Sequence, residues 1–208
     1  MKYDYFSPNE KNRLSIFASA ANTDRDSYYG PGNDPLKAYG KTTDLIAMGG
    51  AQYVHTFDKC LFMPSDLTAG LEYNRDRLKD NMWGYDRHTD QTVNIYSAFL
   101  QNEWKNERWS ILVGGRLDKH NMVDNIIFSP RANLRFNPTQ NINLRLSYSS
   151  GFRAPQAFDE DMHIENVGGT VAMIERTKNL KEEKSQSFSA SADIYHRFGA
   201  FQTNFLIE

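Results

Sequence analysis

Hydrophobic and polar residues alternate with a period of two along most of this chain, and this alternation restricts the folds it can adopt. In the segment Asn141–Ser150, the odd-numbered positions carry Asn, Arg or Ser, whereas the even-numbered positions up to Tyr148 carry Ile, Leu or Tyr. Successive side chains of a β-strand point to opposite faces, whereas an amphipathic helix repeats every 3.6 residues. Helical periodicity is nearly absent here, so the sequence predicts an all-β protein.

About nine segments follow this pattern, and many of them reach about ten residues. They are, in order, Leu14–Ala21, Leu45–Phe57, Leu67–Asn74, Thr92–Trp104, Trp109–Asp118, Arg131–Phe136, Asn141–Ser150, Ser187–Ile194 and Phe201–Glu208. Strands of soluble proteins average about five or six residues, whereas strands that cross a bilayer need about nine to eleven. In the first two segments both faces carry small or apolar residues. In Thr92–Trp104 two apolar sets compete, so the pattern leaves its outer face open.

The connections between these segments alternate in length. Long, polar connections are expected at 22–40, Arg75–Asp90 and 154–182, with shorter ones at Asp58–Ser65 and Lys119–Asn125. Tight turns are expected at Asn106-Glu107, at 137–140 and at Gly199. Outer-membrane barrels have short turns on the periplasmic side and longer loops outside. The alternation therefore favours an antiparallel transmembrane β-barrel over a soluble sandwich.

Composition agrees with a barrel and excludes several other classes. The chain has 24 Lys and Arg against 26 Asp and Glu, a net charge of -2, which argues against nucleic-acid binding. No stretch of 18 apolar residues is present, so no transmembrane helix is predicted. The mean hydropathy of -0.66 still suits a barrel, because only alternate side chains of a barrel strand face lipid. The single cysteine, Cys60, excludes a disulfide framework and a cysteine metal cluster.

Aromatic residues gather near the ends of the expected strands. They are Tyr53, Phe57, Trp104, Trp109, Phe136, Tyr148, Phe152, Tyr195 and Phe198. Aromatic rings favour the headgroup level of a membrane, so this placement is typical of the aromatic girdles of a barrel. Aromatic residues beside hairpins also fill soluble cores, so strand length and loop alternation are needed to favour the girdle.

Two motifs bracket the longest connection. Residues 147–155 read SYSSGFRAP, and residues 179–185 read NLKEEKS. They resemble the TonB-dependent outer-membrane receptors, in which a strand ending in a YxxGFRAP run enters a long extracellular loop and an NxxLxPEKS-like run starts the next strand. Residues 129–134, SPRANL, resemble a strand opening of the same family. Glu182 stands where the family often has Pro, and Asn179 lies one residue closer than usual. The resemblance covers residues 90–208 well and the earlier part by pattern only.

The resemblance implies a closed barrel of about 22 strands with a plugged lumen, preceded by a plug domain and a short segment that contacts TonB. Nine strands cannot close such a barrel. The chain opens without a signal peptide and lacks a final strand that ends in an aromatic residue. Residues 1–208 are therefore expected to be an internal part of the barrel domain, without the plug and the C-terminal strands. The resemblance places the protein in the outer membrane of a Gram-negative bacterium.

The longest connection contains the candidate ligand-binding residues. Arg153 would bring a charge to the rim, and the acidic cluster Asp159, Glu160 and Asp161, with His163, offers oxygen ligands to a cation or a cationic ligand. The alternative interpretation is that Arg153 and its neighbours only end the strand, since Pro155 cannot pair, and that the acidic cluster is a solvated loop. The charged segment Arg75–Asp90 is a candidate for contacts with lipopolysaccharide phosphates or substrate, or is plain surface.

A second candidate set would line the lumen, because its members fall on the polar faces of their segments. They are Glu72, Arg116, Arg131, Arg135 and Arg145. The resemblance implies that such residues hydrogen-bond the plug, and exposure to water inside the barrel is the alternative. The five histidines are scattered, and neither a P-loop nor a GxSxG elbow occurs. No catalytic residue, metal site or cofactor is predicted.

The leading hypothesis is a receptor, not an enzyme, that takes up a metal chelate such as ferric siderophore, haem or cobalamin, driven by TonB. Its expected partners are TonB, the chelate, outer-membrane lipid and lipopolysaccharide. This mechanism is implied by the resemblance. The other hypotheses are a passive outer-membrane channel without a plug and a soluble all-β binding module.

Overall fold

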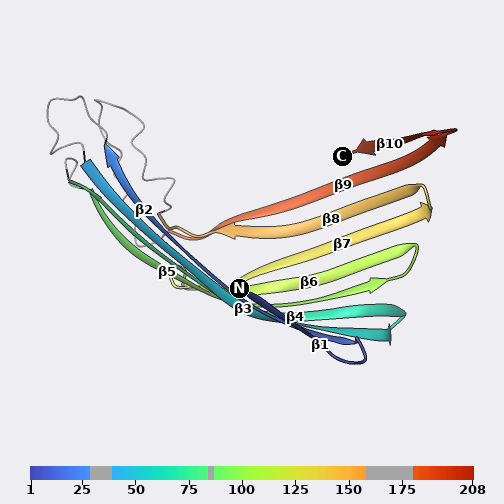
Figure 1. Cartoon of the computed structure of the whole chain (residues 1–208), viewed down its shortest axis with the longest axis horizontal. Helices are drawn as coiled ribbons and strands as arrows, with labels where there is room; N and C mark the ends of the chain where they lie inside the picture. The colour runs from blue at the N-terminus through green and yellow to red at the C-terminus, as the bar shows by residue number, and fades with distance from the viewer. Residues whose placement is uncertain (29–38, 84–86, 158–179) are drawn as a thin grey trace.

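The computed structural model is one antiparallel sheet in which every strand pairs with its neighbours in sequence (Figure 1). The structure describes residues 1–28, 39–83, 87–157 and 180–208. The ten strands are β1 (Lys2–Phe6), β2 (Asn12–Tyr28), β3 (Tyr39–Cys60), β4 (Met63–Met82), β5 (Arg87–Lys105), β6 (Trp109–His120), β7 (Ile127–Thr139), β8 (Ile142–Arg153), β9 (Glu183–Phe198) and β10 (Phe201–Ile207). No helix among the described residues is long and apolar enough to span a membrane.

The tight turns lie together at one end of the sheet, which we call the turn end (right in Figure 1). They join β1 to β2, β3 to β4, β5 to β6, β7 to β8 and β9 to β10. At the last of these turns Gly199 has a φ of 59°, a left-handed conformation that glycine adopts without steric cost. The other connections leave from the opposite end, the loop end. The prediction that the tight turns share one end of the strands and the other connections share the opposite end is therefore confirmed.

The strands β3, β4 and β5 are longer than the sequence indicated. They have 22, 20 and 19 residues, well beyond the about nine to eleven needed to cross a bilayer. The prediction of a long loop at Arg75–Asp90 was wrong: residues up to Met82 extend β4, and those from Arg87 begin β5. Cross-strand ion pairs and buried apolar side chains stabilise this extension, although its many charges read as a loop.

The two faces of the sheet differ in chemistry. Directly paired residues lie on the same face, so the register of all strands defines an inner face, which carries Glu72, Ser97 and Arg116, and an outer face, which carries Leu71, Ala98 and Leu117. Nearly all buried strand residues belong to the inner face, as expected where side chains crowd on the concave side of a curved sheet. The exposed large apolar residues gather on the outer face. We call this group the apolar belt, and it includes Leu71, Tyr96, Leu100, Val113, Leu117, Phe128, Leu146 and Phe188.

The register also settles two points that the sequence left open or missed. In β5, Tyr96, Ala98 and Leu100 pair with outer-face residues of β4, so they form the outer set of Thr92–Trp104. The short strand β1 was not expected, since Lys2–Phe6 mixes charged and aromatic residues without clear alternation. The described residues therefore form ten strands, where the alternation predicted about nine.

Close packing on the inner face depends on glycines, two of which face aromatic rings. A Cβ at Gly70 would lie 2.3 Å from the ring of Phe99, and one at Gly50 would lie 2.7 Å from the ring of Phe17. Each ring therefore covers the backbone of a neighbouring strand. The ring of Phe99 also lines a hollow on this face.

Candidate functional site on the inner face

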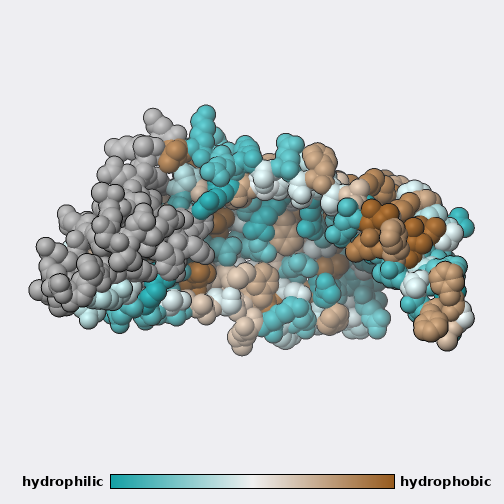
Figure 2. Space-filling view, turned by 90° about the horizontal axis from the view of Figure 1, so that it is seen from above, coloured by the Kyte–Doolittle hydropathy of each residue, from teal (hydrophilic) through white to brown (hydrophobic). Residues whose placement is uncertain are grey.

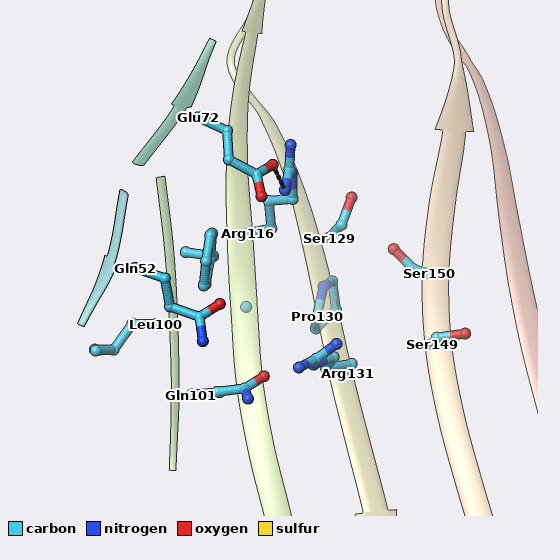
Figure 3. A pocket seen from close by; sticks show the side chains of 12 residues that line it. Gln52, Glu72, Leu100, Gln101, Arg116, Ser129, Pro130, Arg131, Ser149 and Ser150 are labelled. Atoms are coloured by element: carbon cyan, nitrogen blue, oxygen red, sulfur yellow. Dashed lines mark hydrogen bonds and ion pairs between the residues drawn. The ribbon is translucent and has the colours of Figure 1, made fainter. Parts of the chain in front are cut away.

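A hollow of about 420 Å³ lies on the inner face, near the middle of the sheet (Figure 3). Strands β3 to β8 all contribute to its wall. Its polar side chains are Gln52, Glu72, Gln101, Arg116, Ser129, Arg131, Ser149 and Ser150. A second hollow of about 320 Å³ shares Arg116, Ser129 and Ser150 with the first and continues toward the loop end. Seen from above, hydrophilic and hydrophobic side chains are interspersed over the middle of the molecule, and a larger hydrophobic group lies near the turn end (Figure 2).

Arg116 organises the charges at the wall of this hollow. Its Nη1 donates to Glu72 Oε2 at 2.5 Å and its Nε donates to Asp118 Oδ1 at 2.8 Å, so β4 and β6 are joined across β5. Its Nη2 donates to the hydroxyl of Ser97, and that hydroxyl donates to Asp118. The guanidinium therefore meets two carboxylates, and the almost fully buried Asp118 has its charge compensated.

The three other predicted lumen arginines also lie on the inner face, but with different partners. Arg145 pairs with Asp193, at 3.2 Å. Arg135 lies directly opposite Arg145, and its Nε is buried without a hydrogen-bond partner among the described residues. Arg131 is exposed, and within the described part of the chain it contacts no carboxylate. All five predicted residues thus share one face, and Arg131 leaves a positive charge at the hollow. Whether this face meets a plug stays a prediction.

A second polar cluster lies on the inner face nearer the loop end. Arg87 Nε donates to Asp80 Oδ2 at 2.8 Å, and the hydroxyl of Thr42 donates to Asp80 Oδ1 at 2.7 Å. Asp80 and Arg87 are 1% and 4% exposed, and the buried Leu78 and Met82 lie beside them on β4. A buried ion pair is stable only when its remaining polar atoms are also satisfied, and here Thr42 satisfies the second carboxylate oxygen of Asp80. The cluster therefore links β3, β4 and β5.

The residues that follow β8 are tied to the inner face. The Gln91 side chain donates to the carbonyl of Ala157 at 2.9 Å and accepts from its amide at 3.0 Å. The ring of the fully buried His120 contacts Gln156 through Nε2, at 3.0 Å, and its Nδ1 accepts from the amide of Met122. Since Nδ1 accepts, Nε2 carries the proton and donates to Gln156. We call these contacts the clasp, which holds the start of the 154–182 connection over β5 and β6.

The predicted ligand-binding residues fall partly outside the described chain. Asp159, Glu160, Asp161 and His163 lie outside the described residues. Arg153 ends β8, is exposed, and lies opposite Glu183. Among the described residues, no three histidine, cysteine or acidic side chains gather as a metal site would need.

The departure from the family motif at Glu182 has a local effect. Glu182 immediately precedes β9, and Lys184 is the second residue of that strand. The Nζ of Lys184 lies 3.1 Å from Glu182 Oε1. A hydrogen bond from its own backbone amide, together with Lys184, holds the pKa of the Glu182 carboxyl below its usual range. The position that often carries Pro in the family therefore carries an ionised, partnered carboxylate here.

Several residues of the site were not singled out from the sequence. Gln52, Gln101 and Ser129 line the hollow, and Asp80, Arg87 and Gln91 form the clusters nearer the loop end. The alternation was a usable signal for Ser129, which lies two residues before Arg131 on the same face, but not for Gln101, because two apolar sets compete in Thr92–Trp104. Asp80 and Arg87 belong to the charged segment Arg75–Asp90, for which the sequence predicted contacts with lipopolysaccharide phosphates or substrate, or plain surface, rather than a buried ion pair.

Comparison with known proteins supports the arrangement. Residues 2–205 match the model of the family described as TonB dependent receptor-like, beta-barrel. A search of curated proteins finds no match.

Solved structures share the fold at low sequence identity. The siderophore receptor PirA from Acinetobacter baumannii is 16% identical, with a TM-score of 0.65 over 98% of this chain and 32% of its own length. A mutant of the ferric enterobactin receptor PfeA from Pseudomonas aeruginosa, in complex with enterobactin, is 17% identical, with a TM-score of 0.66 over 94% of this chain and 32% of its own. The ferric citrate transporter FecA is 13% identical, with a TM-score of 0.60 over 93% of this chain and 31% of its own.

The chain thus spans about a third of the length of these receptors. The match to the family model extends over nearly the whole chain, and the sheet, its register and its long strands agree with it. The chain belongs to the family of TonB-dependent receptor-like β-barrels.

Proposed function

We propose that this chain forms one arc of a larger outer-membrane receptor that takes up a metal chelate, such as ferric siderophore, haem or cobalamin, by a TonB-dependent mechanism. The match of residues 2–205 to the family model is the observation that carries the proposal. The arc would belong to a closed barrel with a plug, in the outer membrane of a Gram-negative bacterium. The family is one of receptors and transporters rather than enzymes.

The charge of the inner face is suited to a ligand or a plug that carries negative groups. Arg131 reaches the hollow without a carboxylate partner among the described residues, whereas Arg116 is already neutralised by Glu72 and Asp118. A guanidinium binds carboxylates with two parallel hydrogen bonds. The relatives include a transporter named for ferric citrate, whose ligand offers carboxylates. An anionic group of a chelate or of the plug therefore suits this position.

The two alternative functions are less well supported. A soluble sandwich needs two packed sheets, whereas the described residues form one sheet whose outer face exposes a belt of large apolar side chains. A passive channel shares the barrel, and it differs only in lacking a plug and any dependence on TonB. The test must therefore separate active uptake from passive diffusion.

The test is iron uptake by the complete receptor in a Gram-negative strain that lacks its own siderophore receptors. Radioactive iron is supplied as ferric citrate, as ferric catecholate and as haem, and radioactive cobalt is supplied as cobalamin, each with and without functional TonB. Uptake of one chelate that stops without TonB supports the proposal. Uptake that persists without TonB favours the passive channel, and failure to take up any chelate, with the protein present in the outer membrane, contradicts the proposal.

The variant Arg131→Glu sharpens this test, because it reverses the charge at the hollow. We expect it to lower uptake of an anionic chelate by at least tenfold, since one misplaced charge at a binding site costs more than about 1.4 kcal/mol. The control is Arg13→Gln, at an exposed position near the turn end, which is expected to leave uptake unchanged.

A further inference from the structure

His120 is the most deeply buried residue of the clasp. It ends β6 on the inner face, and its side chain is 0% exposed. Its ring lies between two segments at the loop end. Nδ1 accepts from the amide of Met122, in the turn after β6, and Nε2 faces Gln156 Oε1, beyond the end of β8, each at 3.0 Å. One imidazole therefore joins the turn at 121–126 to the start of the 154–182 connection.

The two segments that this ring joins also pack against each other. Val123 of the turn and Ala154, after β8, form a small buried apolar cluster with Ile127. Outside this cluster, Lys119 Nζ donates to the carbonyl of Asp124 at 2.6 Å and fixes the turn from its other side. The clasp therefore closes over a histidine ring that water does not reach.

The closed clasp accepts only the neutral form of His120. The amide of Met122 is a donor, so Nδ1 must keep its lone pair, and the single ring proton must lie on Nε2. A second proton, on Nδ1, would set two N–H groups against each other across the same 3.0 Å. It would also place a cation in a buried site, which costs free energy unless a partner compensates the charge.

The carboxylate that acts on His120 electrostatically is already engaged. It is Asp118, on the same strand, which accepts from Arg116 and from Ser97. On β5, the apolar Ile95 lies directly opposite His120. The other titratable groups on the described elements around the ring are Asp76 on β4, two strands away, and the exposed Asp124 and Arg153. Asp118 therefore offers a proton on His120 little further stabilisation.

From this geometry we propose that acid opens the clasp: a proton on His120 Nδ1 displaces the amide of Met122, and the turn at 121–126 and residues 154–157 separate from the inner face. The open form binds one proton more than the closed form, so the open fraction rises as the pH falls. Histidine suits this role, because its exposed side chain gains a proton near a pH of about 6.5.

The consequence is that acid uncovers part of the inner face at the loop end. The clasp holds the start of the 154–182 connection over β5 and β6, so its release frees that start from both strands. This inference goes beyond the proposed transport and does not depend on it, because it requires only the fold and the contacts of His120.

The test is hydrogen exchange of the complete receptor in detergent, read by mass spectrometry at residues 122–124 and 154–157. Protection is corrected for the intrinsic effect of pH on exchange. Between a pH of about 7.5 and a pH of about 5, we expect wild-type protection to fall at least about tenfold, with the slope of one proton. His120→Gln, which cannot gain that proton, should show no such fall. Unchanged protection in wild type, or an equal fall in His120→Gln, would overturn the proposal.

The matched control is His88→Gln, which removes an exposed histidine at the loop end. It should keep the wild-type dependence on pH. Loss of that dependence in His88→Gln would assign the proton to His88 and would also overturn the proposal.

A second variant keeps the proposal testable if His120→Gln does not fold. Gln156→Glu replaces the amide that faces Nε2 by a carboxylate, which stabilises the imidazolium. The midpoint of the change in protection should therefore move to higher pH by about one unit. A midpoint that stays in place or moves to lower pH would show that His120 does not carry the proton.

Discussion

The inner and outer faces of this sheet are built from alternate residues of the same strands, yet they handle charge in opposite ways. On the inner face, the buried carboxylates are paired with arginines, as Asp80 is with Arg87 and Asp118 is with Arg116. On the outer face, the apolar belt gives way to exposed arginines that make no ion pair with any described residue, as at Arg75. A buried charge must be compensated, whereas a charge at the membrane surface is solvated or bound by lipid. Of two adjacent charged residues on one strand, the inward one therefore needs a partner of opposite charge, whereas the outward one does not.

The largest expected effect comes from Lys79 and Asp80, neighbours whose ion pairs lie on opposite faces. Asp80→Ala should lower the free energy of unfolding of the complete receptor by about 3–5 kcal/mol, because it removes the buried carboxylate that accepts from Arg87 and Thr42. Lys79→Ala should cost less than about 1 kcal/mol, because the pair with Asp90 is exposed. Chemical unfolding in phospholipid vesicles measures both. Equal losses would mean that the two faces do not differ in solvation.

Leu100 and Gln101 test the belt directly. Leu100 is 56% exposed and pairs with the outer-face residue Ala69, whereas Gln101 pairs with the inner-face residue Thr68. We expect Leu100→Arg to destabilise the barrel by about 2–4 kcal/mol, the cost of a cation near the middle of a bilayer. Gln101→Arg should change stability by less than about 1 kcal/mol, since its side chain would stay in a polar environment. A Leu100→Arg variant as stable as wild type in vesicles would show that this surface does not meet lipid.

The charge network at the hollow gives the third pair, Arg116 and Leu117. Arg116→Gln removes the cation from Asp118, which is 2% exposed, and should cost about 2–3 kcal/mol. Leu117→Met, on the outer face, should cost less than about 1.5 kcal/mol because it conserves volume and polarity. The readout is again the midpoint and slope of unfolding in vesicles. If Arg116→Gln were the milder change, the network would not hold β4 to β6.

The smallest effect is local and concerns Gln91 and Thr92. Gln91→Leu removes two hydrogen bonds to Ala157 from the clasp, so hydrogen exchange at residues 156–157 should rise about 5- to 30-fold, for bonds worth about 1–2 kcal/mol together. Thr92→Val, at the outward neighbour, should leave exchange there unchanged. Mass spectrometry of exchanged peptides measures both variants. Unchanged exchange in Gln91→Leu would mean that other contacts hold this segment.

Much of the fold could be predicted from the sequence because barrel strands carry their environment in alternate residues. The alternation in Asn141–Ser150 predicted an apolar and a polar face, and the register of β8 with β7 and β9 confirms both faces. The motif around Arg153 pointed to the end of a strand, where β8 ends. Alternation failed where both faces carry apolar residues, as in Thr92–Trp104, and where charges form cross-strand pairs, as in Arg75–Met82.

The sequence by itself determined the all-β class, the sidedness of the connections and the family, because these follow from local period and from motifs. Only the tertiary structure decided which arginine is paired with carboxylates and which contacts none among the described residues. Arg116 and Arg131 are the same residue type on the same polar face, but Arg116 meets Glu72 and Asp118 whereas Arg131 meets the hollow. Pairing depends on the register of strands far apart in the chain, and a period of two carries no information about which charges that register brings together.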